Sequence, residues 1–129
     1  LTLEVKDIMK TIKPTILQDK KVADALKIMT KSKSGAVMVV GKNGKIVGYF
    51  TDGDLRRGLL KTPNITDKKI STVMTKNPIT FTKDIKAVEA AKIIFSKKID
   101  NAPVVDKNNK PIGLVDEKDL LEFIPKSKK

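Results

Sequence analysis

The chain has 129 residues, of which 40% are apolar and 33% are charged, so it has the composition of a soluble globular protein rather than a disordered or fibrous one. It contains no His and no Cys, which excludes thiol nucleophiles, histidine acid–base catalysis, disulfides and nearly every zinc site. No segment reaches the roughly 20 apolar residues that cross a bilayer, and no signal peptide opens the chain, so we expect a cytoplasmic protein.

The net charge of +12 comes almost entirely from lysine, because only Arg56 and Arg57 are arginines among the 27 basic residues. Lysine lacks the forked guanidinium that reads base edges, and one Tyr and four Phe offer little surface for stacking on nucleobases. We therefore expect neither nucleic acid nor a membrane as a partner, whereas such a field would attract small anionic molecules.

The chain contains the same unit twice. Displacing the sequence by 65 residues brings identical residues together over most of the unit. The matched pairs include Met9 and Met74, Asp19 and Asp84, Gly48 and Gly113, and Asp54 and Asp119. We therefore expect one repeat at residues 1–62, a linker at 63–69, a second repeat at 70–125 and a disordered basic tail at 126–129.

Each copy predicts the element order β-α-β-β-α. In the first copy a short strand after Pro14 precedes a helix whose apolar residues recur at helical spacing, and two β-rich runs around Asn43-Gly44 form a hairpin before a second short helix. In the first copy we expect strands at 15–16, 36–40 and 46–50 and the last helix at 52–60. In the second copy we expect strands at 79–81, 102–105 and 112–115 and the last helix at 117–123. Because the hairpin strands do not alternate, both their faces should be covered. We expect an α/β (α+β) fold in which the repeats pack about a pseudo-twofold axis, since neither alone has enough chain to bury its apolar stripes.

The strongest candidate site lies at the end of the first hairpin. Thr51 and Asp54 are three residues apart across a predicted helix start, so a hydroxyl and a carboxylate can converge on one side. Such a carboxylate suits the diol of a ribose, and the free N–H groups of a helix start suit an anion. The alternative is that Thr51 caps the helix and Asp54 adds first-turn charge. The ribose interpretation requires the Asp54 carboxylate not to be turned into the chain's own backbone.

The doubled unit resembles a tandem pair of cystathionine β-synthase (CBS) domains, a Bateman module, over nearly the whole chain. The resemblance is carried by the G-x-x-T-x-x-D run at 48–54, the strand at 102–106 and the Val-Met starts near Met9 and Met74. It implies that Thr51 and Asp54 hold the ribose of an adenosine or other nucleoside. The rest of this first cleft would come from the partner repeat, namely Ile79, Thr80, Lys98, Ile99, Asp100, Asn101 and Ala102. A second cleft would combine Asp119 with Thr15, Ile16, Ser34, Gly35, Ala36 and Val37.

The second copy departs from this pattern, because Asp116 stands where Thr is expected. The extra carboxylate beside the diol acceptor repels phosphate and removes a donor, while Asp116 and Glu117 would favour the start of the last helix. We therefore expect nucleotide binding in the first cleft and leave the second open.

A narrower resemblance links the runs 49–57 and 98–106 to the C-terminal CBS pair of arabinose-5-phosphate isomerases. These sugar-phosphate isomerases supply the pathway to 3-deoxy-D-manno-octulosonate (Kdo) in Gram-negative bacteria and carry a sugar-isomerase (SIS) domain ahead of the CBS pair. The chain begins directly before its first Val-Lys-Asp-Ile-Met run at Val5, so we expect catalysis to reside in an attached SIS domain rather than here.

The resemblance implies a regulatory module that binds CMP-Kdo, CMP, AMP or ATP, biases the attached SIS domain and forms a homodimer through its CBS modules. Arg56, Arg57 and Lys98 are candidates for holding the anionic part of the ligand. We expect no catalytic residue, no metal and no cofactor besides this nucleotide regulator. Three alternatives remain. The chain could be a CBS module of another enzyme or transporter that senses adenine nucleotides, or a basic nucleic-acid binder with steep salt dependence. It could also be an enzyme that holds Mg²⁺ on Asp52 and Asp54 or on Asp116 and Asp119.

Overall fold

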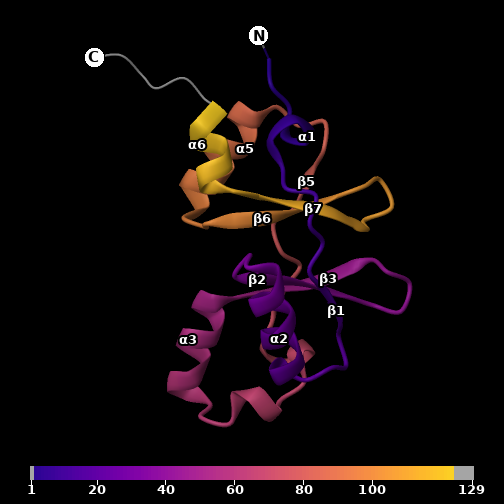
Figure 1. The fold of residues 1–129 in the computed structure, drawn as a ribbon, viewed down its shortest axis with the longest axis vertical. Helices are drawn as coiled ribbons and strands as arrows, with labels where there is room; N and C mark the ends of the chain where they lie inside the picture. The colour runs from indigo at the N-terminus through magenta and orange to yellow at the C-terminus, as the bar shows by residue number, and fades with distance from the viewer. Residues whose placement is uncertain (1, 124–129) are drawn as a thin grey trace. The chain divides into compact units, whose positions relative to one another are not determined.

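The computed structural model describes residues 2–123, and the predicted basic tail at 126–129 lies outside them. The chain divides into two compact units (Figure 1). Unit 2 is the continuous stretch Lys13–Pro78, and unit 1 combines the segment up to Ile12 with the chain from Ile79 onward. Each unit holds a small sheet and its own hydrophobic core.

Unit 2 has a four-stranded sheet in the order β1-β2-β3-β4. Strand β1 is parallel to β2, and the hairpin of β2 and β3 is antiparallel, as is the pair of β3 and β4. Helices α2 and α3 lie on one side of this sheet (Figure 1). The elements are β1 (Thr15–Leu17), α2 (Val22–Ser32), β2 (Ala36–Val40), β3 (Ile46–Thr51), α3 (Asp52–Lys61), the 3₁₀ turn η1 (Ile65–Asp67), α4 (Ile70–Val73) and β4 (Thr75–Lys76).

Unit 1 repeats this plan with a three-stranded sheet in the order β5-β6-β7. Strand β5 is parallel to β6, and β6 is antiparallel to β7. Helices α5 and α6 lie together on one side of the sheet (Figure 1). The elements are α1 (Val5–Ile8), β5 (Phe81–Thr82), α5 (Ala87–Lys97), β6 (Asn101–Val105), β7 (Pro111–Asp116) and α6 (Glu117–Phe123).

The predicted β-α-β-β-α order is confirmed in both copies, including the first strand and the hairpins, and the structure adds that each first strand is parallel to the second. The absence of alternation has the predicted cause, because Val37, Met38 and Val39 of β2 are each fully buried although successive side chains point to opposite faces. The helical stripe of α2 is buried through Val22, Ala25 and Met29. In α5, Val88 and Phe95 are about half exposed, although they share the helical spacing of the stripe, and Ala87, Ala90 and Ala91 enter the core.

Each structural unit contains the first segment of the other sequence repeat. The sequence did not predict this exchange. Residues before Ile12 pack on the second repeat: α1 contacts α5 and α6, and Lys10 forms two backbone hydrogen bonds with Leu114 of β7, at 2.7 and 2.9 Å. The matching segment α4–β4 of the second repeat packs on the first, where Thr75 pairs with Tyr49. Each repeat therefore completes its sheet edge with the beginning of the other. Within residues 2–123, no helix combines the length and apolarity that a membrane span requires.

Candidate functional site

Thr51 and Asp54 meet at the start of α3, where β3 runs directly into the helix. The Thr51 Oγ1 accepts the backbone N–H of Asp54 at 3.2 Å, and Oδ2 of Asp54 accepts the backbone N–H of Thr51 at 3.0 Å. This reciprocal pair is a capping box, which satisfies two otherwise unpaired N–H groups of the helix start. The predicted convergence of hydroxyl and carboxylate is present, and the capping alternative describes what these groups do in the structure.

The requirement that Asp54 be free of the backbone is met by only one of its two oxygens. Oδ2 is bound to the Thr51 N–H, whereas Oδ1 accepts from Nη2 of Arg57 at 3.0 Å. Arg57 is the predicted anion-binding residue that the structure brings to this site, and its side chain is 65% exposed. A ligand hydroxyl at Asp54 would therefore have to share or replace a side-chain contact, not a backbone one.

The segment before each hairpin is tied to the helix start of its own repeat. The Gly35 carbonyl accepts the N–H of Asp52 at 2.9 Å, and at the equivalent place the Asp100 carbonyl accepts the N–H of Glu117 at 2.8 Å. In register, Ala36 pairs with Thr51. Each helix start thus has a rigid neighbour within its own unit.

The residues predicted to complete the first cleft belong to unit 1, whereas Thr51 and Asp54 belong to unit 2. Their pairing across the repeats therefore stays a prediction. Lys98 ends α5 in a left-handed conformation (φ 55°) and is exposed, as is Asp100, while Ile79 and Ile99 pack against the core of unit 1. The remaining predicted residues of this cleft are half-buried Thr80 and Asn101 and the core residue Ala102.

The residues predicted to join Asp119 in the second cleft likewise lie in the other unit. Ile16 and Val37 are core residues of unit 2, so their side chains are committed to packing. Ser34 makes local hydrogen bonds with Ser32 and with the carbonyl of Ala36. The other members are half-buried Thr15 and Gly35 and fully buried Ala36.

Asp116 and Asp119 repeat the capping box with a second carboxylate in place of the Thr hydroxyl. Oδ1 of Asp116 accepts the N–H of Asp119 at 2.8 Å, and Oδ2 of Asp119 accepts the N–H of Asp116 at 3.2 Å. The predicted role of Asp116 in starting the last helix is thus present. The sequence did not point to Lys10, whose Nζ lies 2.9 Å from Oδ2 of Asp116 and 3.9 Å from Oδ1 of Asp119.

The pKa values of Asp116 and Asp119 shift in opposite directions, and Lys10 lies closer to Asp116. Partial burial raises the pKa of Asp116, but the hydrogen bonds from Lys10 and from the Asp119 N–H outweigh it, so the pKa lies below its ordinary value. Partial burial is also the largest influence on Asp119, where the adjacent charge of Asp116 adds to it and the pKa lies above its ordinary value. The hydrogen bond to Asp116 raises the pKa of Lys10.

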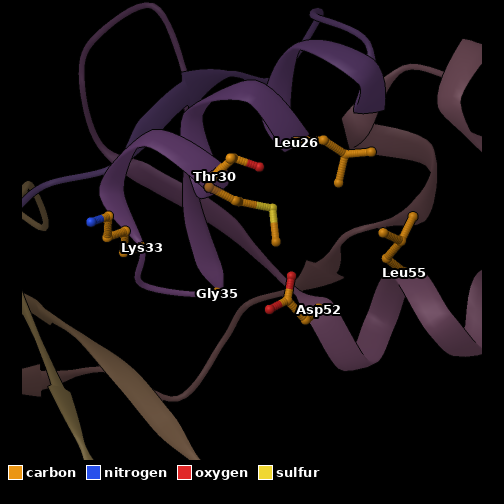
Figure 2. A pocket seen from close by; sticks show the side chains of 7 residues that line it. Leu26, Thr30, Lys33, Gly35, Asp52 and Leu55 are labelled. Atoms are coloured by element: carbon orange, nitrogen blue, oxygen red, sulfur yellow. The ribbon is translucent and has the colours of Figure 1, made fainter.

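A pocket of about 410 Å³ lies between α2 and the start of α3 (Figure 2). Its volume falls in the range of small-molecule sites. Gly35, at φ +70°, leaves room for Asp52, because a Cβ there would lie 2.8 Å from Oδ2 of the Asp52 carboxylate. Among the lining residues, the sequence pointed to Gly35 as a cleft residue and to Asp52 as a candidate Mg²⁺ ligand. The lining residues are Leu26, Met29, Thr30, Lys33, Gly35, Asp52 and Leu55.

In the part of the chain that the structure describes, no three acidic side chains gather as metal ligands would. The aspartates considered as Mg²⁺ ligands were the pairs Asp52 with Asp54 and Asp116 with Asp119. Of these, Asp54, Asp116 and Asp119 are engaged in the two capping boxes.

Two segments of the chain, residues 5–61 and 70–126, match the CBS domain profile. Over 123 residues the chain is 37% identical to arabinose 5-phosphate isomerase KdsD of Pseudomonas aeruginosa, a match that covers 94% of this chain and 38% of that protein. It is also 40% identical over 109 residues to inosine-5'-monophosphate dehydrogenase of Aquifex aeolicus, covering 84% of this chain and 22% of that enzyme. The chain therefore spans less than half the length of these relatives.

The fold also matches a solved CBS domain pair, that of protein MJ0100 in complex with 5'-methylthioadenosine and S-adenosyl-L-methionine. The TM-score is 0.85 at 28% identity, and the match covers 95% of this chain and 96% of that one. The doubled unit inferred from the sequence is thus the unit seen in that pair.

Proposed function

The chain belongs to the CBS domain family as a tandem pair, and we propose from this premise that it is the nucleotide-sensing regulatory module of an arabinose 5-phosphate isomerase. The observation that carries the proposal is the 37% identity to KdsD across 94% of the chain. In this proposal the chain performs no chemistry itself, and an attached SIS domain of the same parent protein carries the catalytic residues.

The proposed ligand is a nucleotide whose ribose is held at the start of α3. Asp54 keeps spare acceptor capacity on Oδ1, and the Thr51 hydroxyl keeps its proton to donate while its oxygen accepts the Asp54 N–H. Arg57 would exchange its contact with Oδ1 for the anionic part of the ligand, with Arg56 and Lys98 nearby in the proposed site. The MJ0100 pair, which was solved with two adenosine compounds, supports a ligand of this class.

Regulation follows if the ligand binds one arrangement of the two repeats better than another. The partner repeat's segments, Ile79–Thr80 and Lys98–Ala102, would complete the site, so the ligand would bridge both repeats. A ligand can shift such an equilibrium only by its difference in affinity, which is typically about 1–3 kcal/mol. By the pathway of the isomerases, CMP-Kdo acts as an end-product signal in this proposal.

The second candidate is a CBS module that senses adenine nucleotides for another enzyme. The 40% identity to an inosine-5'-monophosphate dehydrogenase over 109 residues favours it. The two candidates differ in the base and the sugar that the module selects.

Calorimetric titration of the purified chain with CMP-Kdo, CMP, AMP and ATP tests both candidates. Tighter binding of CMP-Kdo than of AMP supports the isomerase module, and binding of AMP or ATP alone supports the second candidate. Asp54→Ala should abolish binding, whereas Asp24→Ala, an exposed first-turn aspartate of α2, is the matched control and should leave it unchanged. No response to any of the four ligands contradicts the nucleotide proposal.

We also propose that the module pairs as a homodimer through its helices. Leu59 and Leu60 of α3 are 44% and 85% exposed, and Val88 and Phe95 of α5 are about half exposed. Apolar residues of this size on solvent-facing helix surfaces are typical of association surfaces. Sedimentation equilibrium tests this directly, and a monomer at all concentrations would contradict it.

A further inference from the structure

The two repeats neutralise their helix-start aspartates from different places. In the first repeat, Arg57 reaches Asp54 from within the same helix. In the second, the position equivalent to Arg57 is Glu122, and the positive charge comes from Lys10, which is 106 residues away from Asp116 in sequence.

Lys10 faces the carboxylate oxygens that the backbone leaves unused. In each capping box one oxygen of every carboxylate accepts an N–H, and the other remains for a further partner. In the second repeat those remaining oxygens are Oδ2 of Asp116 and Oδ1 of Asp119, and the Lys10 ammonium forms ion pairs with both. It therefore takes the place where a ligand hydroxyl would bind.

The backbone holds Lys10 at this place. Its N–H and carbonyl both pair with Leu114 on the edge strand β7. The close approach depends on Gly113, because a Cβ there would overlap the Lys10 carbonyl oxygen. Its repeat-related counterpart, Thr75, pairs with Tyr49 in the same way but carries no charge.

We propose that Lys10 is a built-in occupant of the Asp116–Asp119 pair, and that it leaves only the first repeat able to receive a nucleoside ribose. This inference rests on the proposed nucleotide binding and deepens it, since it makes Lys10 the residue that sets the number of sites. A ligand at the second repeat has to displace an ammonium that is hydrogen-bonded to Asp116 and lies 3.9 Å from the free oxygen of Asp119.

The test converts the second repeat into the first. The double variant Lys10→Thr/Asp116→Thr carries the residues found at Thr75 and Thr51, both of which the fold accepts at the equivalent positions. Both changes are needed, because removing Lys10 alone leaves two uncompensated carboxylates. The probe is 5'-methylthioadenosine, which has a ribose 2′,3′-diol and no phosphate for Asp116 to repel. Calorimetry should give one site per wild-type chain and two per double-variant chain.

Two controls assign the sites. Lys6→Thr removes a lysine from the same segment, one that pairs with Glu4 at 3.1 Å instead, and should leave one site. Adding Asp54→Ala should remove the only wild-type site and leave one of the two sites of the double variant. Two sites in the wild type, or one in a folded double variant, would overturn the proposal.

A proton titration separates this proposal from the nucleotide proposal. If neither protein binds the probe, nucleotide binding fails, and the role of Lys10 as occupant is decided by carboxyl ¹³C chemical shifts of wild type and Lys10→Met. The charged group that faces the pair from another element is Lys10, and Glu122 of α6 acts in turn on Lys10. Loss of the Lys10 ammonium should raise the pKa of Asp116, and an unchanged pKa would overturn the occupant role.

Discussion

Gly113→Ala tests whether the exchanged N-terminal segment depends on a close backbone approach. A Cβ at position 113 would overlap the carbonyl oxygen of Lys10. This oxygen belongs to the backbone, so it cannot move without moving the segment around Lys10. The repeat supplies a matched control, because a Cβ at Gly48 overlaps instead the side chain of Met74. Methionine is flexible, so Gly113→Ala should cost more stability than Gly48→Ala.

The expected magnitude follows from the contacts that would be lost. Separation at position 113 breaks the two hydrogen bonds between Lys10 and Leu114, each of which contributes about 0.5–1.5 kcal/mol net. Because Ala loses less conformational entropy on folding than Gly, the substitution also stabilises the folded state by about 0.5–1 kcal/mol, which offsets part of this loss. We therefore expect Gly113→Ala to lower the free energy of unfolding by about 1 kcal/mol, within a range of about 0–2.5 kcal/mol. Gly48→Ala keeps its hydrogen bonds and gains the entropic advantage, so it should not be destabilised by more than a few tenths of a kcal/mol.

Urea unfolding measures the stability difference, and amide hydrogen exchange locates it. In Gly113→Ala the amides of Lys10 and Leu114 should lose protection while those of Tyr49 and Thr75 keep it. If Gly113→Ala is as stable as Gly48→Ala, or if exchange at Lys10 is unchanged, the segment is not held in the way described.

Four further outcomes are expected. Thr51→Ala should cost about 1 kcal/mol of stability in urea unfolding through the lost helix cap, and Thr51→Ser should recover it. Arg57→Gln should weaken binding of AMP but not of 5'-methylthioadenosine in calorimetry, since only AMP carries the phosphate. Lys10→Met should lower stability by about 0.5–1 kcal/mol near pH 7. In pH-dependent thermal unfolding that difference should vanish as pH falls below the ordinary aspartate pKa of about 3.9, because protonation of Asp116, whose pKa is lowered in the fold, removes the paired charge. Ile94→Ala should destabilise by about 2–5 kcal/mol in urea unfolding, because Ile94 is fully buried in the core of unit 1.

The elements set by local sequence could be predicted, whereas the pairing of distant segments could not. The turn at Asn43-Gly44 and the helical spacing of Val22 and Ala25 are signals contained within a few residues, and both elements are present. Helix α1 and strand β4 span only four and two residues, too few for a period to show. Their exchange depends on which sheet edge each segment reaches, and no local pattern records that.

The same distinction between local and distant residues applies to the candidate site. Thr51 and Asp54 could be brought together from the sequence, because three residues across a helix start fix their relation. Lys10 could not, because its partner Asp116 is 106 residues away. The repeat did hold one signal: the 65-residue displacement aligns Lys10 with the uncharged Thr75, just as it aligns Asp116 with Thr51. Both residues of the Lys10–Asp116 contact are charged, whereas both of their counterparts in the other repeat are threonines, so the two copies differ at both ends of this contact.

The exchanged segments also impose an order on events during synthesis. All segments of unit 2 lie in the continuous stretch Lys13–Pro78 and are present together once it leaves the ribosome, whereas the stretch up to Ile12 must wait for its partners, which begin at Ile79. At about 5–20 residues per second that delay lasts several seconds. Throughout it the apolar side chains of Val5 and Ile8 have no native sheet to cover them. The segment up to Ile12 is thus made before unit 2 but reaches its final place only after the chain from Ile79 onward has been made.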